Sequence, residues 1–162
     1  QIMKNGEIGE ICIKGNNVTS GYENNPEANK TSFSDGWFRT GDQGFFDKDG
    51  YLKISGRLKE IINKGGEKIS PLEVDNVLMD HPSIEQAVCF GYEDKMLGED
   101  IATAIILKEG VNFTETDLKV YAKEKLVKFK IPKKIFFVTE IPKGATGKLQ
   151  RNVLAKKFGL DN

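Results

Sequence analysis

The sequence predicts an α+β fold in two parts, a β-rich segment over residues 1–57 and a small domain over residues 58–162 with the order β-α-β-β-α-β. Two observations support this. Before position 57, short apolar runs alternate with turn residues, whereas later segments show apolar residues at helical spacing between β runs. With 162 residues, 38% hydrophobic and 30% charged, the chain suits one or two small globular domains.

The first part contains three local signals. The stretch GEIGEICIKG alternates apolar and polar residues as a strand does, and Asp49-Gly50 between two short apolar runs predicts a hairpin. Between them, Asn25 as a cap and Pro26 at the first helical position predict a short helix. This segment has no helical layer of its own to cover a sheet, so we expect it to be the end of a larger N-terminal domain.

The second part begins with the apolar segment LKEIIN, after a boundary at Arg57 to Lys59. The stretch SPLE at 70–73 predicts a capping box with Pro71 at the first helical position, and His81-Pro82 ends this helix. Its apolar residues recur at helical spacing.

The rest of the second part completes the predicted order. The runs SIEQAVCFGY and DIATAIILKEG predict two strands joined by an acidic loop. Thr114 and Asp117 open a second helix, KIFFV predicts another strand, and a short last helix is expected at about 149–157.

Charge is distributed unevenly along the chain. Residues 57–118 carry 6 basic and 13 acidic side chains, whereas residues 119–162 carry 12 basic and 3 acidic ones. Such a basic segment attracts anions, but it contains one arginine and no interleaved aromatic pattern, so nucleic acid is not an expected partner. No run of about 18 apolar residues predicts a membrane span. A cytoplasmic location is the expected default, and a peroxisomal one stays open although the C-terminus LDN offers no SKL-type address.

Several catalytic and metal-binding classes receive no support from the residues. His81 is the only histidine, which argues against a histidine metal cluster or a Ser-His-Asp triad, and no metal ligand is assigned. Asp47 and Asp49 lack the spacing of a calcium loop, and NKGGEK at 63–68 lacks the pattern of a P-loop. Cys12 and Cys89 lie in strand-like apolar runs and are interpreted as small core residues.

Four ordered motifs together resemble the adenylate-forming (AMP-binding) enzyme superfamily, which includes acyl-CoA synthetases. GEICIKGNNVTSGY is similar to that family's GE(L/I)xIxGxxVxxGY, and GWFRTGD to its (W/Y)xxTGD. GRLKEIINKGGEKISPLEVD is similar to GRxK(D/E)xIxxxGxxIxPxE(V/I)E, and IPKGATGKLQR to (L/I)PxxxxGKxxR. The resemblance covers residues 6–157. It implies that residues 1–57 end a large N-terminal AMP-binding domain and that residues 58–162 are its mobile C-terminal α+β domain.

The resemblance also implies roles for single residues. It places Asp42 on the ribose hydroxyls of ATP and Arg57 on the same nucleotide, which suits a carboxylate and a guanidinium fork. Lys59 matches the hinge between the domains. The remaining positions are Gly65 and Gly66, which match the backbone of the CoA channel, and Lys148, which matches the catalytic lysine.

The implied activity is that of an acid–CoA ligase using a carboxylic acid, ATP and CoA, most similar to oxalate and medium-chain acid–CoA ligases. Mg²⁺ is implied as a cofactor whose ligands belong to the missing N-terminal domain, so this chain alone is expected to be inactive. Two alternatives remain open from the sequence. One is a carrier-protein-loading adenylation enzyme, and the other is a non-catalytic, lysine-rich module that binds an anionic partner.

Overall fold

The computed structural model describes residues 2–144, 147 and 149–160. The chain divides into two units, Gln1–Lys59 and Glu60–Asn162. That the first unit is the end of a larger domain stays a prediction.

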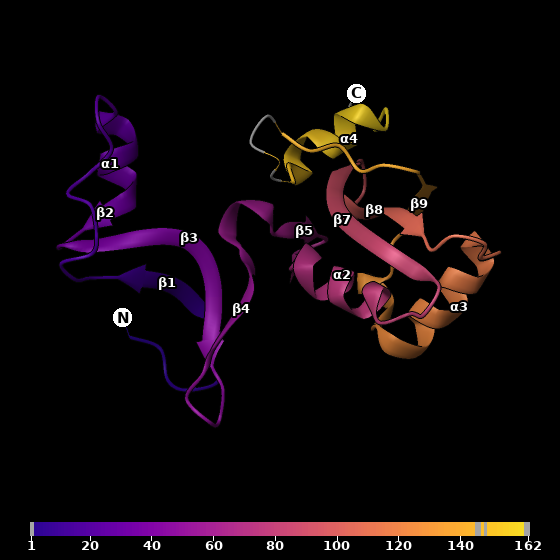
Figure 1. Ribbon diagram of the computed structural model, residues 1–162, viewed down its shortest axis with the longest axis horizontal. Coiled ribbons are helices and arrows are strands. Elements are labelled where there is room, and N and C mark those ends of the chain that lie inside the picture. Colours follow the sequence, from indigo (N-terminus) through magenta and orange to yellow (C-terminus); the bar gives the residue numbers. More distant parts are fainter. Residues whose placement is uncertain (1, 145–146, 148, 161–162) are drawn as a thin grey trace. The chain divides into compact units, whose positions relative to one another are not determined.

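The first unit is built on one antiparallel sheet (Figure 1). The long central strand β3 pairs antiparallel with each of the other three strands. The elements are β1 (Gly9–Ile13), α1 (Pro26–Ser32), β2 (Phe33–Ser34), β3 (Trp37–Phe46) and β4 (Leu52–Arg57).

Two local signals in this unit are confirmed. Asn25 caps α1, because its side-chain oxygen accepts a hydrogen bond from the amide of Ala28 at 3.1 Å, and Pro26 opens the helix. The hairpin between β3 and β4 is closed by the Asp47 carboxylate, which accepts hydrogen bonds from the amides of Asp49 and Tyr51. This aspartate therefore stabilises a turn, as expected for Asp at such a position.

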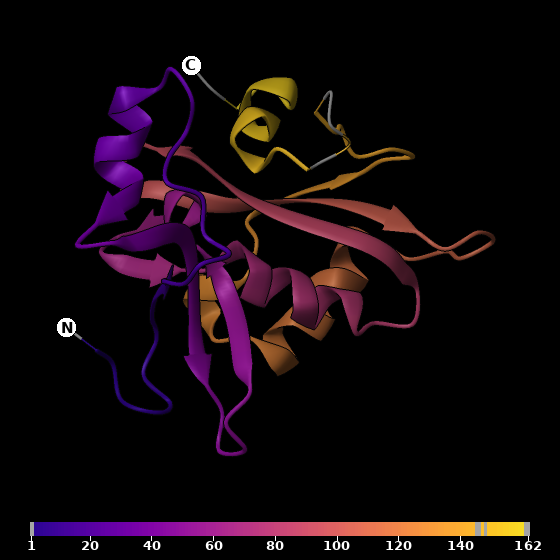
Figure 2. The same cartoon turned by 60° about the vertical axis from the view of Figure 1, so that its left-hand side comes forward.

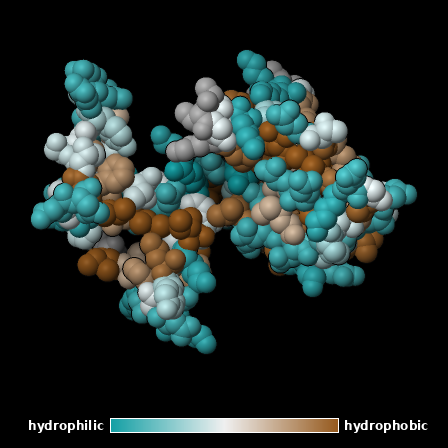
Figure 3. Space-filling model, viewed as in Figure 1, coloured by the Kyte–Doolittle hydropathy of each residue, from teal (hydrophilic) through white to brown (hydrophobic). Residues whose placement is uncertain are grey.

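Large apolar side chains lie at the surface of the first unit, where Figure 3 shows them in brown. Among the described residues, every buried hydrophobic side chain belongs to Ile62 or a later position. The exposed apolar set on the first sheet and its connections comprises Ile8, Ile13, Tyr22, Trp37, Phe46, Tyr51, Leu52 and Ile54. A sheet of this kind needs a second layer to cover it.

The second unit contains a five-stranded sheet in the order β6-β5-β8-β7, with β9 pairing parallel to β8. Its strands are β5 (Ile62–Lys64), β6 (Glu67–Ile69), β7 (Ile84–Asp94), β8 (Gly98–Leu107) and β9 (Lys134–Phe137). Its helices are α2 (Pro71–Met79), α3 (Glu115–Lys125) and α4 (Leu154–Lys157), with short 3₁₀ turns at Lys128–Lys130 and Arg151–Val153. A further 3₁₀ turn, Leu58–Glu60, spans the boundary between the two units.

The sheet of the second unit has a hydrophobic core on each face. One core joins the sheet to α2 and α3 through residues such as Val74, Leu78 and Leu118. The other packs Phe90 and neighbouring sheet residues against Ile141 and the C-terminal segment that contains α4. Figures 1 and 2 show α2 and α3 on one side of β7 and β8, and α4 on the other.

The predicted α+β class and the order of elements are confirmed, with one addition. The segment predicted as a turn around Gly65 and Gly66 also carries β6, which forms a hairpin with β5. The capping box predicted at Ser70 and Glu73 is wrong: Ser70 is the N-cap residue, but its side chain makes no capping hydrogen bond, and Glu73 binds Lys130 instead.

Candidate functional site

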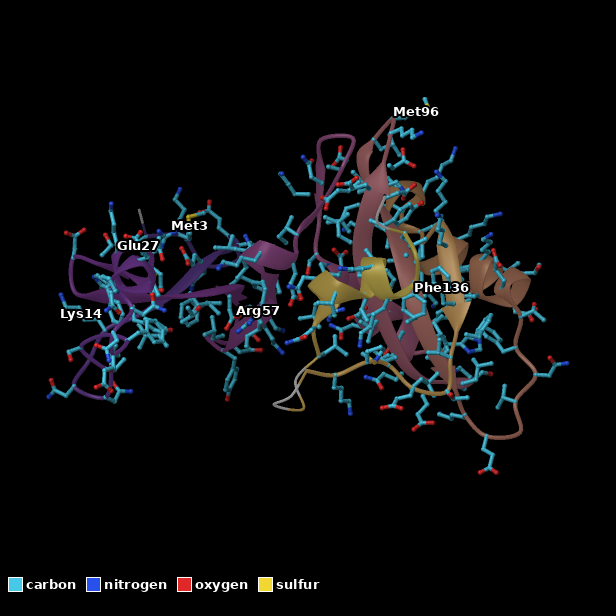
Figure 4. All side chains as sticks on the ribbon, turned by 90° about the horizontal axis from the view of Figure 1, so that it is seen from above. Met3, Lys14, Glu27, Arg57, Met96 and Phe136 are labelled. Atoms are coloured by element: carbon cyan, nitrogen blue, oxygen red, sulfur yellow. The ribbon has the colours of Figure 1, made fainter. Side chains whose placement is uncertain are left out.

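Asp42 and Arg57, both predicted to contact a nucleotide, are brought together by the register of the first sheet. They lie directly opposite each other on β3 and β4, and Arg57 Nε donates to Asp42 Oδ1 at 2.7 Å. Thr40 holds the segment before Asp42, since its hydroxyl accepts from the Asp42 amide and donates to the Ile11 carbonyl. The Arg57 side chain, labelled in Figure 4, is 62% exposed.

An exposed ion pair of this kind adds little to stability. It leaves the second carboxylate oxygen and the two terminal guanidinium nitrogens with their own hydrogen-bonding capacity. A ligand with vicinal hydroxyl groups and an anionic group offers matching donors and acceptors, which is the chemistry that the family resemblance implies for these two residues.

Lys59 is the last residue of the first unit and lies in the 3₁₀ turn Leu58–Glu60, with an exposed side chain. The hinge role stays a prediction. The next residue, Glu60, is anchored inside the second unit by a hydrogen bond from Arg151 Nε to its Oε2 at 2.9 Å.

Gly65 and Gly66 form the exposed turn between β5 and β6. Both have positive φ, +60° and +94°, the conformation of a two-residue hairpin turn that glycine adopts without strain. A Cβ atom at Gly65 would lie 3.3 Å from Leu97 Cδ2, so the turn packs closely against the start of β8.

Lys148, the predicted catalytic residue, lies outside the described residues. The described ends of its segment are held in place: Lys143 and Leu149 form an isolated antiparallel bridge, and the Gly147 amide donates to the Gly144 carbonyl at 2.9 Å. The buried side chain of Ile141 anchors the entrance to this segment in the second core.

Arg151, at the exit from the same segment, makes a buried network that the sequence did not reveal. Its guanidinium binds Glu60, donates to the carbonyl of Cys89 at 2.9 Å and lies 2.6 Å from Asp75 Oδ2. Asp75 Oδ1 in turn accepts the Cys89 amide at 2.6 Å. The sequence did carry a signal for these two residues, because Arg151 and Asp75 are the last positions of two of the four motifs quoted above.

The pKa shifts in this network follow from burial. Burial raises the pKa of the Asp75 carboxyl, and the Arg151 guanidinium opposes that shift. Burial also raises the pKa of the Cys89 thiol well above its ordinary value, and the Asp75 charge adds to this effect. A thiol held protonated in this way is unreactive, in keeping with a core role for Cys89.

Metal-ligand clusters and membrane-spanning helices are both absent from the part of the chain that the structure describes. No group of three or more His, Cys, Asp or Glu side chains in that part could hold a metal ion. Its helices are all too short or too polar to cross a membrane.

Comparison with known proteins identifies a matching family model and related sequences. Residues 73–148 match the family model of the AMP-binding enzyme C-terminal domain. The chain is 53% identical over 158 residues to an oxalate–CoA ligase of Arabidopsis thaliana, an alignment that covers 98% of this chain and 31% of that protein. The chain thus spans about a third of the length of this curated relative.

Solved structures give the same result for the fold. The o-succinylbenzoate CoA synthetase of Bacillus subtilis, in complex with its acyl-adenylate intermediate, superposes with a TM-score of 0.86 at 41% identity, covering 95% of this chain and 31% of that one. The same synthetase in complex with ATP and a magnesium ion superposes with a TM-score of 0.84 at 40% identity, covering 94% and 31%.

Proposed function

Since this chain belongs to the adenylate-forming (AMP-binding) enzymes and carries their C-terminal domain, we propose that it is the C-terminal portion of an ATP-dependent acid–CoA ligase. The observation that carries the proposal is the match over nearly the whole chain to a CoA ligase at 53% identity. The carrier-protein-loading enzyme and the non-catalytic anion-binding module are not favoured by these relatives.

The proposed reaction has two steps. A carboxylate oxygen of the acid attacks the α-phosphorus of ATP, the bond to pyrophosphate breaks, and an acyl-adenylate forms. The sulfur of CoA then attacks the acyl carbon, the bond to AMP breaks, and an acyl-CoA thioester is released. Oxalate is the first acid to assay, because an oxalate–CoA ligase is the relative at 53% identity.

Each predicted site residue receives a role in this scheme. Asp42 and Arg57 bind the nucleotide, which is supported by their pairing at the ends of β3 and β4 with the guanidinium exposed. Lys59 is the hinge, which is supported by its place at the boundary between the two units. In the second unit, Gly65 and Gly66 line the CoA channel and Lys148 supplies a positive charge during adenylation.

The chain alone does not complete this site. The exposed apolar side chains of the first unit indicate a surface that another layer covers in the longer protein, which agrees with the 31% share of the relative's length. As the family resemblance implies, we assign the Mg²⁺ ligands to the part of the ligase outside this chain. A cytoplasmic location stays a prediction from the sequence.

The experiment that tests the proposal is Lys148→Ala in the longer ligase. Adenylation brings two anions together, so loss of the ammonium should slow acyl-adenylate formation by roughly two orders of magnitude, about 2.7 kcal/mol. Conversion of ready-made acyl-adenylate to acyl-CoA should stay near the normal rate, because the hinge has by then carried the Lys148 segment away.

Quenched-flow measurement of the two half-reactions separates these outcomes. Lys143→Ala, a lysine change in the same segment, is the matched control and should leave both rates near normal. An equal fall in both half-reactions for Lys148→Ala would contradict alternation between two domain arrangements. Unchanged adenylation would contradict the ligase role of this lysine.

A further inference from the structure

The β5–β6 turn is held by β8 through both backbone and side-chain bonds. Backbone pairing between β5 and β8 is the single register position Lys64↔Gly98, and the Gly65 amide donates to the Leu97 carbonyl at 2.8 Å. Beside this, the Asn63 amide donates to Glu99 Oε2 at 2.6 Å. The Glu99 side chain therefore substitutes for a strand partner at Asn63, two residues before the first of the two glycines.

A buried ion pair adds a further anchor to the same turn. Lys64 Nζ lies 2.5 Å from Asp100 Oδ1, with side chains that are 13% and 2% exposed. Asp100 Oδ1 also accepts the amide of Ile101 at 2.8 Å. Charged side chains remain buried to this extent only when they are paired and hydrogen-bonded, so the Lys64 ammonium is committed to the interior of the protein.

The ion pair continues into a chain of alternating charges. Lys133 Nζ lies 3.5 Å from Asp100 Oδ2 and donates to Asp94 Oδ2 at 2.9 Å. Asp94 then accepts the amides of Met96 and Leu97 through its other oxygen. The four residues Lys64, Asp100, Lys133 and Asp94 thus connect the glycine turn to the tip of the β7–β8 hairpin, where Figure 4 labels Met96.

Position in the sequence suggests a different use for Lys64. Lys64 directly precedes the two glycines in NKGGEK, which are proposed to line the CoA channel. CoA carries phosphate groups, and a lysine at such a position would ordinarily be expected to bind one of them. Lys68, which lies opposite Asn63 on β6, has an exposed side chain instead.

We propose that Lys64, Glu99 and Asp100 are positioning residues for the thioester-forming step. Their contacts between β5 and β8 hold the Gly65–Gly66 turn in one conformation. They act through the turn and do not touch the substrate. The inference rests on the proposed function, because it requires that this turn line the CoA channel. Its physical basis is that a loosely held turn no longer keeps the CoA sulfur in position to attack the acyl carbon. Misplacement of the reacting atoms by about 1 Å costs about a hundredfold in rate.

The test uses the longer ligase and compares four variants. Glu99→Ala removes the acceptor of the Asn63 amide, whereas Glu99→Gln keeps an amide oxygen in its place. Lys64→Met removes the buried charge, and Lys68→Met is its matched control on the facing strand. Two quantities are measured, the rates of the two half-reactions and the deuterium exchange of the peptide that spans residues 61–69.

We expect Glu99→Ala and Lys64→Met to slow thioester formation by about tenfold or more, with adenylation changed by less than about twofold. Both should speed deuterium exchange in residues 61–69 and leave exchange in β7 unchanged. Glu99→Gln should restore most of the rate, and Lys68→Met should retain exchange protection.

Three results would overturn the inference: an equal fall in both half-reactions, normal thioester formation despite faster exchange, or unchanged exchange in Glu99→Ala. Failure of the proposed function has a different signature, since the unmodified ligase would then form no acyl-adenylate. Because exchange is measured without substrate, the anchoring of the turn is tested in either case.

Discussion

At the scale of single residues, Asp94 at the end of β7 shows how neighbouring hydrogen-bond donors stabilise one carboxylate charge. The hydrogen bond from the Lys133 ammonium, followed by those from the amides of Met96 and Leu97, lowers the pKa of Asp94 from 3.8 to about 2. The folded chain therefore binds this proton more weakly than the unfolded chain does. The resulting stability is fully present above about pH 4 and is lost as the pH falls through about 2.

Asp94→Asn should consequently be less stable than the wild type at neutral pH, with a difference that closes between pH 4 and pH 2. The measurement is the free energy of urea unfolding at a series of pH values. Lys133→Met removes the main cause of the pKa shift. The difference in stability between this variant and the wild type should therefore also close between pH 4 and pH 2. A gap that stays constant down to pH 2 would show that Asp94 acts through shape and not through charge.

Arg151 shows what sequence reasoning misses at this scale. The motifs predicted Asp42 and Arg57, and the structure places them opposite each other because both lie on neighbouring strands joined by one recognisable hairpin. The partners of Arg151 come from Glu60, 91 positions away, and from the Cys89 carbonyl, 62 positions away. Such pairings depend on how the sheet, α2 and the C-terminal segment pack, which no local pattern encodes.

At the scale of elements, the two main helices of the second unit begin differently. The α3 helix has a complete capping box: Thr114 Oγ1 accepts the Asp117 amide at 3.3 Å, and Asp117 Oδ2 accepts the Thr114 amide at 2.9 Å. The α2 helix begins with Pro71 and has no side-chain cap. The sequence pattern predicted the N-terminus of both helices. In α2, however, the Glu73 side chain binds Lys130 and so does not form the capping box.

Thr114→Ala should therefore lower the free energy of unfolding by about 1 kcal/mol, the usual cost of losing an N-cap side chain. Thr116→Ala, at an exposed position in the first turn of the same helix, is the control and should change stability by less than about 0.5 kcal/mol. Urea denaturation followed by circular dichroism measures both. Equal effects from the two changes would mean that loss of a hydroxyl, and not loss of the cap, determines the result.

The β6 strand was missed because it is short and carries little pattern. It spans three residues, of which only Ile69 is apolar, so the alternation that reveals longer strands has no room to appear. The long strands β7 and β8 gave strong apolar runs and were predicted from them. The short strand β9 was nevertheless predicted because KIFFV contains a continuous apolar run, so length and apolar content together decided which elements could be predicted.

At the scale of the whole molecule, the two units differ in whether they bury a core. The second unit holds two core clusters, whereas the described residues of the first unit bury no large apolar side chain. We expect residues 60–162 to fold cooperatively when expressed alone, and residues 1–59 to remain largely unfolded. Dispersion of amide resonances in NMR spectra of the two pieces tests this, and a well-dispersed spectrum for residues 1–59 would contradict it.

The isolated 162-residue chain should also bind ATP only weakly, with a dissociation constant above the micromolar range. Asp42 and Arg57 supply two contacts on an exposed surface, and in the proposed ligase most of the affinity should come from a preorganised site outside this chain. Isothermal calorimetry measures this directly. Micromolar binding to the wild-type chain, abolished by Asp42→Ala, would show that this portion already contains the main nucleotide site.

The network around Arg151 determines where related ligases can exchange this segment by recombination. Glu60, Asp75, the Cys89 carbonyl and Arg151 must come from compatible parents, since a guanidinium that loses one buried carboxylate leaves an unpaired charge behind. A crossover between Arg57 and Glu60 transfers the whole network at once. A crossover within residues 76–150 instead combines an arginine from one parent with carboxylates from the other. Folded chimeras should therefore have their junctions concentrated between Arg57 and Glu60.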